Sequence, residues 1–307
     1  MVFDAVYYEP DSLKYELGLH LMEQYPDIPW IPIESHNSIK EMQEKPNSEF
    51  GHMKRNLIMG IRKTHKYVEN HKVSDYLVPF TSSGCTAMCL YCYLVCNYNK
   101  CAYLRLFVNR EQMLDRLLRR SLKEPGQTYE IGSNSDLVLE NTITGNLLYT
   151  IPRFAEEGNG SLTFPTKFHM VEPLLSLNHR GKVIFRMSVN PQPIISRIEL
   201  GTSSLKERIQ AVNQMCEAGY PCGLLIAPVI LTDGWKDMYR ELLEELEAGL
   251  SDKMKKTMFL EIILMTYSYV HRAINAEAFP AAPDLYSKEL MTGRGRGRYL
   301  SLIHISE

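Results

Sequence analysis

Short apolar runs rich in β-branched and aromatic residues recur from residue 76 onward, and longer stretches with a helical apolar period separate them. Runs of this length and composition predict buried strands. The predicted strands cover residues 76–80 (YLVPF), 103–108 (YLRLFV), 128–131 (TYEI), 161–164 (SLTF), 183–189 (VIFRMSV), 223–231 (GLLIAPVIL) and 258–267 (MFLEIILMTY). Such alternation of strand and helix implies an α/β fold of parallel strands with right-handed crossovers, either an open doubly wound sheet or a complete or partial barrel.

Two of the intervening stretches carry helix-start signals. In residues 204–219, Ser204 and Glu207 form a capping-box pattern, and Gly219 stands where a C-terminal cap is expected. A second helix is predicted to begin near Asn109, with a capping-box partner three residues on. Both stretches place apolar residues along one face, as helices that cover a sheet do.

The first part of the chain has a mixed pattern without this alternation. Residues 1–75 are therefore predicted to form an N-terminal segment that packs on the repeating core, and the basic stretch 53–67 (MKRNLIMGIRKTHKY) fits a helix. The repeating core is expected to cover residues 76–270, and residues 271–307 to form a C-terminal segment.

Composition narrows the class of protein. The 307-residue chain is 45% hydrophobic and 23% charged, as a folded globular protein is. It has no apolar run of the length that a membrane span needs and no signal-peptide pattern at its start, so a cytoplasmic protein is expected. Because the formal net charge is only -2, a nucleic-acid partner would have to be met by a local basic face.

Five of the seven cysteines lie between Cys85 and Cys101, which favours a metal or redox site over a disulfide framework. Cys85, Cys89 and Cys92 have the spacing C-x3-C-x2-C after the first predicted strand. Thiolates on the loop at the carboxyl end of a strand suit an iron–sulfur cluster. Zinc prefers four protein ligands, and Cys96 or Cys101 as a fourth ligand would give a closed site for zinc or an electron-transfer cluster.

With Tyr91 before its last cysteine, this loop has the pattern C-x3-C-x-aromatic-C, and in this it resembles the radical S-adenosylmethionine superfamily. The resemblance implies a partial (β/α)6 barrel of TIM type, with an N-terminal extension and a C-terminal β-hairpin arm. It also implies a 4Fe-4S cluster held by Cys85, Cys89 and Cys92. The open iron would bind S-adenosyl-L-methionine and cleave it to a 5'-deoxyadenosyl radical.

Within that superfamily, residues 76–299 resemble the spore photoproduct lyase family. Besides the cysteine loop, the resemblance is carried by 129–136 (YEIGSNSD), 162–175 (LTFPTKFHMVEPLL), 183–191 (VIFRMSVNP), 217–230 (EAGYPCGLLIAPVI) and 278–286 (AFPAAPDLY). It implies a DNA repair lyase for the spore photoproduct, the dimer 5-thyminyl-5,6-dihydrothymine. Hydrogen abstraction from C6 of the lesion, cleavage of the methylene bridge and return of hydrogen would restore two thymines.

The same resemblance implies partners and a location. These are DNA that contains the thymine dimer, a reduced electron donor of the flavodoxin or ferredoxin type, and the spore core of a spore-forming bacterium, with the protein a monomer.

Individual site residues follow from the resemblance as well. Those that match the cofactor contacts of the family are Ser135, Lys167, Ser188 and Ala227. A lysine at the end of a buried strand costs free energy unless it is paired, so Lys167 is expected to find a partner at the barrel mouth. Tyr91 and Tyr93 flank Cys92 and match tyrosines that are thought to pass a hydrogen atom near the radical.

One position departs from the family pattern. Ser133 stands where many members have the cysteine that returns a hydrogen atom to the product radical. A serine O–H bond is too strong for that reaction. Cys96 is therefore the hypothesised hydrogen donor, with Cys101 as the other candidate.

The tract GRGRGRY matches the lesion-contacting hairpin of the family and carries Arg294, Arg296 and Arg298, which are expected to bind DNA. The chain stops shortly after this tract, so a shortened hairpin is expected. Basic clusters at Lys54 and Arg55 and on the predicted helices are either phosphate contacts or solvated outer faces.

Two other functions fit parts of the pattern. Another radical S-adenosylmethionine enzyme, acting on a small molecule, a peptide or RNA, would share the cysteine loop without needing the Gly-Arg arm. A non-catalytic metal-binding or nucleic-acid-binding protein would have a closed four-cysteine site.

Overall fold

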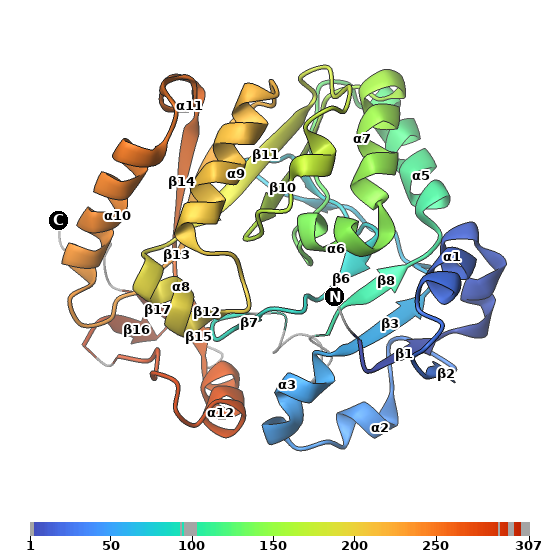
Figure 1. The fold of residues 1–307 in the computed structure, drawn as a ribbon, viewed down its shortest axis with the longest axis horizontal. Helices are drawn as coiled ribbons and strands as arrows, with labels where there is room; N and C mark the ends of the chain where they lie inside the picture. The colour runs from blue at the N-terminus through green and yellow to red at the C-terminus, as the bar shows by residue number, and fades with distance from the viewer. Residues whose placement is uncertain (1–2, 93, 95–102, 288, 294–297, 302–307) are drawn as a thin grey trace.

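A curled sheet of seven strands, in the order β14-β13-β11-β10-β9-β5-β4, forms the larger half of the computed structural model (Figure 1). The structure describes residues 3–92, 94, 103–287, 289–293 and 298–301. Of these, residues 299–301 are described by their backbone alone. The seven strands are β4 (Val68–Glu69), β5 (Tyr76–Leu77), β9 (Thr128–Glu130), β10 (Ser161–Thr166), β11 (Val183–Val189), β13 (Cys222–Val229) and β14 (Phe259–Leu264).

The strands from β5 to β14 are parallel and follow chain order across the sheet, whereas β4 pairs antiparallel with β5. This curled sheet confirms the predicted partial barrel and excludes a complete one among the described residues.

Helices cover the outer face of this half-barrel (Figure 1). They are α5 (Arg110–Lys123), α6 (Leu137–Thr144), α7 (Asn146–Glu157), η3 (Glu172–Leu174), α8 (Gln192–Ile198), α9 (Leu205–Glu217), α10 (Trp235–Gly249) and α11 (Asp252–Thr257). Their apolar faces and the outward side chains of the strands form one core, in which Leu117, Phe154, Phe185 and Val212 are each 0% exposed. The other face of the sheet carries polar side chains such as Glu130 and Arg186 together with apolar ones such as Leu225 and Ile263.

Both predicted helix starts are confirmed, but only one of them has the predicted side-chain cap. At α9, Glu207 N donates to Ser204 Oγ at 3.4 Å and Ser204 N donates to Glu207 Oε2 at 2.7 Å, which is the predicted capping box. At α5, Asn109 precedes the helix but makes no side-chain cap, because its Oδ1 accepts from Arg62 N at 3.0 Å. A hydrogen bond to the segment that follows β3 thus takes the place of the expected hydrogen bond within the first turn of α5.

A second, smaller sheet has the order β2-β1-β3-β8-β6. Its strands are β1 (Ala5–Tyr8), β2 (Trp30–Pro32), β3 (Asn56–Gly60), β6 (Ser82–Ser83) and β8 (Arg105–Phe107). Short helices join them: η1 (Pro10–Lys14), α1 (Glu16–Gln24), α2 (Lys40–Gln43), η2 (Asn47–Glu49) and α3 (Phe50–Met53). We call this part the N-terminal sheet unit.

The N-terminal sheet unit corrects two sequence expectations. The stretch 53–67 is not a helix: it contains β3, in which Leu57, Ile58 and Met59 are each 0% exposed. Consecutive buried residues of this kind belong to a strand that is covered on both faces. The predicted strand 103–108 forms β8, but it pairs with β3 and not with the half-barrel.

Two further segments lie at the junction of the sheets. The cysteine loop includes β7 (Met88–Cys89), which pairs antiparallel with β12 (Glu199–Leu200). At the carboxyl end of the chain, β15 (Thr266–Ser268), α12 (Tyr269–Ala278), β16 (Met291–Gly293) and β17 (Arg298–Ser301) follow one another. Strands β16 and β17 are antiparallel neighbours, as the predicted hairpin requires.

No helix within the described part of the chain is long and apolar enough to cross a bilayer.

Candidate active site

The three motif cysteines face one cavity at the mouth of the half-barrel. Cys85, Cys89 and Cys92 are free thiols of intermediate burial, and all three line a cavity of about 420 Å³. The loop that carries them follows β5 and β6, so it lies where the sequence places it, beside the carboxyl ends of the parallel strands. Chemistry in α/β folds gathers at this edge.

The surroundings of these thiols set their protonation. Burial raises the pKa of Cys85 to about 12, and burial together with the charge of Glu199 raises the pKa of Cys89 as well. Neutral thiols are poor ligands, but coordination to a metal removes the thiol proton. Cysteine thiolates are the ligands that iron–sulfur clusters use, and the three thiols open on one cavity, so the predicted cluster stays a prediction that fits this site. Among the described residues, no three His, Cys, Asp or Glu side chains are grouped closely enough for a single metal ion.

Hydrogen bonds from several parts of the fold hold the backbone of the cysteine loop. Lys54 Nζ donates to the carbonyl of Cys85 at 2.7 Å, and Asn275 Nδ2 on α12 donates to the carbonyl of Leu90 at 2.6 Å. Leu90 N also donates to Ile198 O at 2.9 Å. Lys54 is 5% exposed, so it does not form an outer basic face as its sequence cluster suggested.

The four predicted cofactor residues line the same cavity as the cysteines. Lys167, directly after β10, has its Nζ 2.8 Å from Ser188 Oγ, 3.3 Å from Ala227 O and 3.9 Å from Glu199 Oε1. These are the partners that a half-buried lysine needs at the barrel mouth. Ser135 also lines this cavity, and its hydroxyl accepts from Ser82 Oγ at 2.6 Å. The structure thus brings the four together, and their contact with the cofactor stays a prediction.

Behind this cavity lies a buried polar network that sequence reasoning missed. Glu199 and Arg208 are each 0% exposed, and Arg208 NH2 is 2.7 Å from Glu199 Oε2. Tyr91 OH donates to the Glu199 carboxylate, and Asn190 Nδ2 donates to it at 2.8 Å. The one sequence signal was Arg208 itself, a charge three residues after Leu205 on the apolar face of α9. Glu199 carried no such signal.

Charge fixes the protonation of this network. Burial alone would raise the pKa of Glu199, but the charges of Arg208 and Lys167 outweigh it and hold that pKa below its ordinary value. Burial and the Glu199 charge raise the pKa of Tyr91 well above its ordinary value. Tyr91 is therefore a neutral hydrogen-bond donor to an ionised carboxylate.

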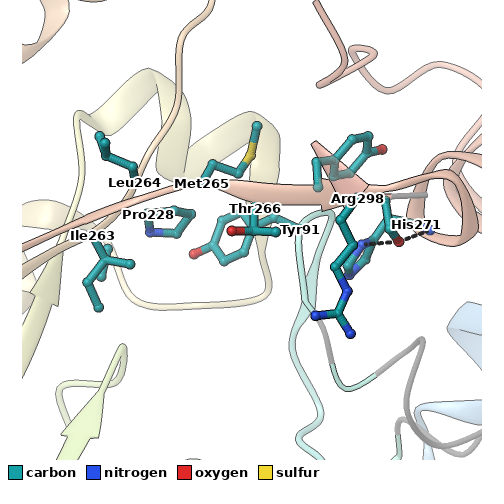
Figure 2. A pocket seen from close by; sticks show the side chains of 11 residues that line it. Tyr91, Pro228, Ile263, Leu264, Met265, Thr266, His271 and Arg298 are labelled. Atoms are coloured by element: carbon teal, nitrogen blue, oxygen red, sulfur yellow. Dashed lines mark hydrogen bonds between the residues drawn. The ribbon is translucent and has the colours of Figure 1, made fainter. Parts of the chain in front are cut away.

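A second cavity, of about 570 Å³, is lined largely by residues that follow β13 in the chain (Figure 2). Tyr91 and Ala227 line both cavities. On its far side the second cavity is lined by His271 of α12 and Arg298 of β17. His271 Nδ1 lies 3.0 Å from Ser268 Oγ, a contact drawn in Figure 2. The second cavity therefore lies between the tyrosine beside the cysteines and an arginine of the hairpin.

Several predicted residues lie elsewhere or are not described. Arg298 faces the second cavity, while Arg294 and Arg296 fall outside the described residues. Tyr93, Cys96 and Cys101 fall outside them as well.

The residue that departs from the family pattern lies in the first cavity. Ser133 lines it together with the motif cysteines. Two other described thiols, Cys216 and Cys222, are buried in the main core and do not line it. Within the part of the chain that the structure describes, the cavity therefore offers only the thiols of the motif.

Comparison with known proteins shows the family of this chain. A family model described as spore photoproduct lyase matches residues 1–300. The chain belongs to the spore photoproduct lyase family. The spore photoproduct lyase of Bacillus subtilis is 33% identical over 306 residues, which are 96% of this chain and 89% of the relative. That of Clostridium acetobutylicum is 30% identical over 257 residues, 82% of this chain and 76% of the relative.

Solved structures of spore photoproduct lyases share the fold. One mutant structure, with bound AdoMet and dinucleoside spore photoproduct, matches with a TM-score of 0.91 at 27% identity and covers 99% of this chain and 92% of its own. Another, complexed with dinucleoside spore photoproduct, matches with a TM-score of 0.88 at 27% identity and covers 98% and 90%. The resemblance seen in the sequence is confirmed at the level of family and fold.

Proposed function

We propose that this chain is a DNA repair lyase that splits the spore photoproduct back to two thymines with the help of S-adenosyl-L-methionine. The observation that carries the proposal is that two cavities share a wall lined by Tyr91, Ala227 and Ile263. One holds the cysteines and the residues predicted to bind the cofactor, and the other opens toward Arg298 of the hairpin. The relatives that share this fold include one with AdoMet and the lesion bound together.

The residues of the first cavity fit the proposed cofactors. Cys85, Cys89 and Cys92 would hold three irons of a 4Fe-4S cluster and leave the fourth for S-adenosyl-L-methionine. When bound, this pair would supply the electron and the 5'-deoxyadenosyl radical that the reaction needs. The chain's own part is to place the thiolates around one space and to exclude water from it.

Lys167 is the main cofactor anchor in this proposal. Its ammonium lies between the Ser188 hydroxyl and the Ala227 carbonyl, so it is held in place before any ligand arrives. A carboxylate that entered the cavity would gain a charge-assisted hydrogen bond from it. Ser135 and Ser188 offer hydroxyls to the remaining polar groups of the cofactor.

On the substrate side, the proposal needs the lesion to leave the DNA stack. Enzymes that act on bases usually extrude them, and extrusion is easiest where base pairing is already damaged. The second cavity would receive the flipped dinucleotide, and Arg298, with Arg294 and Arg296 before it in the chain, would contact the DNA. Tyr91, in the shared wall, would separate the lesion from the cofactor.

The return of hydrogen to the product is assigned to another thiol than the usual one. Ser133 cannot act as hydrogen donor, so we propose Cys96, with Tyr93 as a relay. Replacement Cys96→Ala is expected to raise the share of aborted products while cofactor cleavage continues. A normal repair yield in that variant would eliminate Cys96.

The remaining parts of the proposal concern the setting of the enzyme. They are an electron donor of the flavodoxin or ferredoxin type, a monomeric enzyme, and action in the cytoplasm of the spore core.

Incubation of the anaerobically reconstituted, reduced protein with a synthetic dinucleotide spore photoproduct tests the function. Conversion of the lesion to thymidylyl-thymidine, dependent on S-adenosyl-L-methionine, is the expected result. Cofactor cleavage without lesion repair would indicate a radical enzyme for another substrate. Bound zinc without any cleavage would refute an enzyme of this class.

A further inference from the structure

We propose that Lys54 is a positioning residue, whose buried ammonium holds the cysteine loop through the Cys85 carbonyl and favours the reduced state of a cluster bound there. The inference rests on the proposed function, because that function supplies the cluster. It also assigns the N-terminal sheet unit a part in the chemistry beyond packing.

The geometry places Lys54 against the metal-binding loop from outside the half-barrel. It follows α3 in the N-terminal sheet unit, and its Nζ is 2.7 Å from the carbonyl oxygen of Cys85. The ammonium also lies 5.3 Å from the centre of the Phe50 ring. At 5% exposure it is shielded from water, so its charge is screened far less than that of a surface lysine. The same burial lowers the pKa of Lys54, and the charges of the three motif cysteines oppose this.

The packing around Lys54 fixes this placement. Phe50 and Met53 of α3 are buried in the same apolar cluster as Ile58 of β3, and Met88 and Cys92 of the cysteine loop pack against that cluster. The N-terminal sheet unit therefore presents a rigid surface to the loop. Lys54 is the cation on that surface that reaches a cysteine carbonyl.

The two lysines at the loop have different tasks. Lys167 reaches the cavity from the half-barrel and contacts Ser188 and Ala227, where the cofactor is expected. Lys54 contacts the loop backbone and does not line the cavity, so it does not compete for the cofactor. Its charge acts on the thiolates themselves.

Electrostatics then gives the direction of the effect. Reduction adds one electron, taken from the reduced donor protein of the proposed function, and no bond forms or breaks in this step. A fixed positive charge close to the site of reduction lowers the free energy of the more negative state. Without the ammonium, the reduced cluster is less stable relative to the oxidised one.

The test measures the midpoint potential of the reconstituted cluster by redox titration followed by electron paramagnetic resonance. In Lys54→Met and Lys54→Gln the equilibrium constant for reduction of the cluster is expected to fall about tenfold. For one electron this lowers the midpoint potential by ~59 mV. Lys54→Arg keeps the charge and is expected to stay within about threefold of the parent protein. The Gln variant keeps a hydrogen-bond donor, so it separates the charge from the bond.

Lys182→Met is the matched control. Lys182 Nζ also donates to two backbone carbonyls, those of Ala155 at 2.9 Å and Gly158 at 2.8 Å, but it precedes β11, away from the cysteine loop. This variant is expected to keep the parent potential. An equal shift in Lys182→Met would overturn the inference, because the effect would then be a general result of losing a lysine.

Iron content distinguishes the remaining outcomes. Lys54→Gln with a full cluster and an unchanged potential would overturn the inference. Loss of the cluster from both neutral variants but not from Lys54→Arg would support a need for charge at the loop. Loss of the cluster from all three Lys54 variants would overturn the inference, because Lys54 would then be needed only for packing. If the parent protein assembles no 4Fe-4S cluster, the proposed function itself fails and the inference loses its premise.

Discussion

The N-terminal sheet unit and the half-barrel are both built mainly from parallel strands, yet their inner faces differ in chemistry. In β3, consecutive residues are apolar and 0% exposed, because protein covers both faces of that strand. In β11, apolar Phe185 and Met187 face the helices, while Arg186 and Ser188 alternate with them. β3 is therefore apolar on both faces, whereas β11 is apolar only on the face that the helices cover.

The polar face of the half-barrel is held together by paired charges. The Arg186 side chain, only 3% exposed, lies 2.8 Å from Glu130 and 3.3 Å from Glu261. Outside the seven-stranded sheet, Glu199 of β12 pairs with Arg208 of α9 beside the cysteine loop. Removing a charge from water costs free energy, and an oppositely charged partner offsets that cost. Buried ion pairs therefore add little net stability, and we interpret those of the half-barrel as serving the site.

Breaking one charge pair in the half-barrel is the largest expected effect. Arg208→Met leaves the Glu199 carboxylate buried without its cation, and the free energy of unfolding is expected to fall by about 3–5 kcal/mol. Chemical denaturation followed by circular dichroism measures it. Arg240→Met is the matched control, since Arg240 is 66% exposed in its ion pair with Asp237 and its loss is expected to change stability by less than about 1 kcal/mol. Equal effects in the two variants would contradict the difference between buried and surface pairs.

Removing the ligand-facing cation Lys167 gives the next effect. The Glu199–Arg208 pair stays in place, although a charge 3.9 Å from Glu199 Oε1 is lost as well. Lys167→Met is expected to weaken binding of S-adenosyl-L-methionine by about 10–100-fold, because a charge-assisted hydrogen bond is worth ~1.5–3 kcal/mol. Equilibrium binding to the reconstituted protein measures it. Lys182→Met serves again as control and should bind the cofactor as the parent does. Unchanged affinity in Lys167→Met would show that the cofactor carboxylate binds elsewhere.

The smallest expected effect is a difference in how acid changes the stability of the two regions. Burial lowers the pKa of His36 in the N-terminal sheet unit, so below its unfolded value of about 6.5 the unfolded state binds more protons and stability falls. In the half-barrel, Glu199 has a lowered pKa and loses its contribution only as pH falls below its ordinary value. Burial raises the pKa of Asp136 and Glu140, so the folded state binds protons at these two carboxyls more readily than the unfolded state does. Acid therefore adds stability through them and offsets the stability that is lost at Glu199.

Hydrogen exchange between pH 7 and pH 5 checks this order, after correction for the intrinsic exchange rate. Amides of β1 and β3 are expected to lose protection before those of β10 and β11. His36→Gln removes the titration and should narrow the difference between the two regions. Simultaneous loss of protection in the parent protein would mean that the regions open as one unit.

Local sequence signals predicted the half-barrel well, because its strands, the capping box of α9 and the cysteine spacing are short-range features. The same signals failed where partners are distant in sequence. Asn109 was predicted to cap a helix but bonds to Arg62, and 103–108 was predicted as a barrel strand but pairs with β3. Neither partner is visible from local pattern.

The candidate site shows the same limit. The cysteines and Lys167 were found from spacing and resemblance, and the structure brings them to one cavity. Glu199 sits on a two-residue strand with no motif of its own, and it became visible only when the fold placed Tyr91 and Arg208 against it. Lys54 was taken for a surface charge because its burial depends on α3 packing against the loop.

The most direct test of the proposed repair chemistry follows one hydrogen atom. A dinucleotide spore photoproduct carrying deuterium at the abstracted C6 position is incubated with the reduced, reconstituted protein, and the 5'-deoxyadenosine and S-adenosyl-L-methionine are analysed by mass spectrometry. Deuterium in either species, together with two restored thymines, is the predicted result. Restored thymines with no deuterium in either would contradict hydrogen abstraction from the lesion by a radical formed at the cysteine loop.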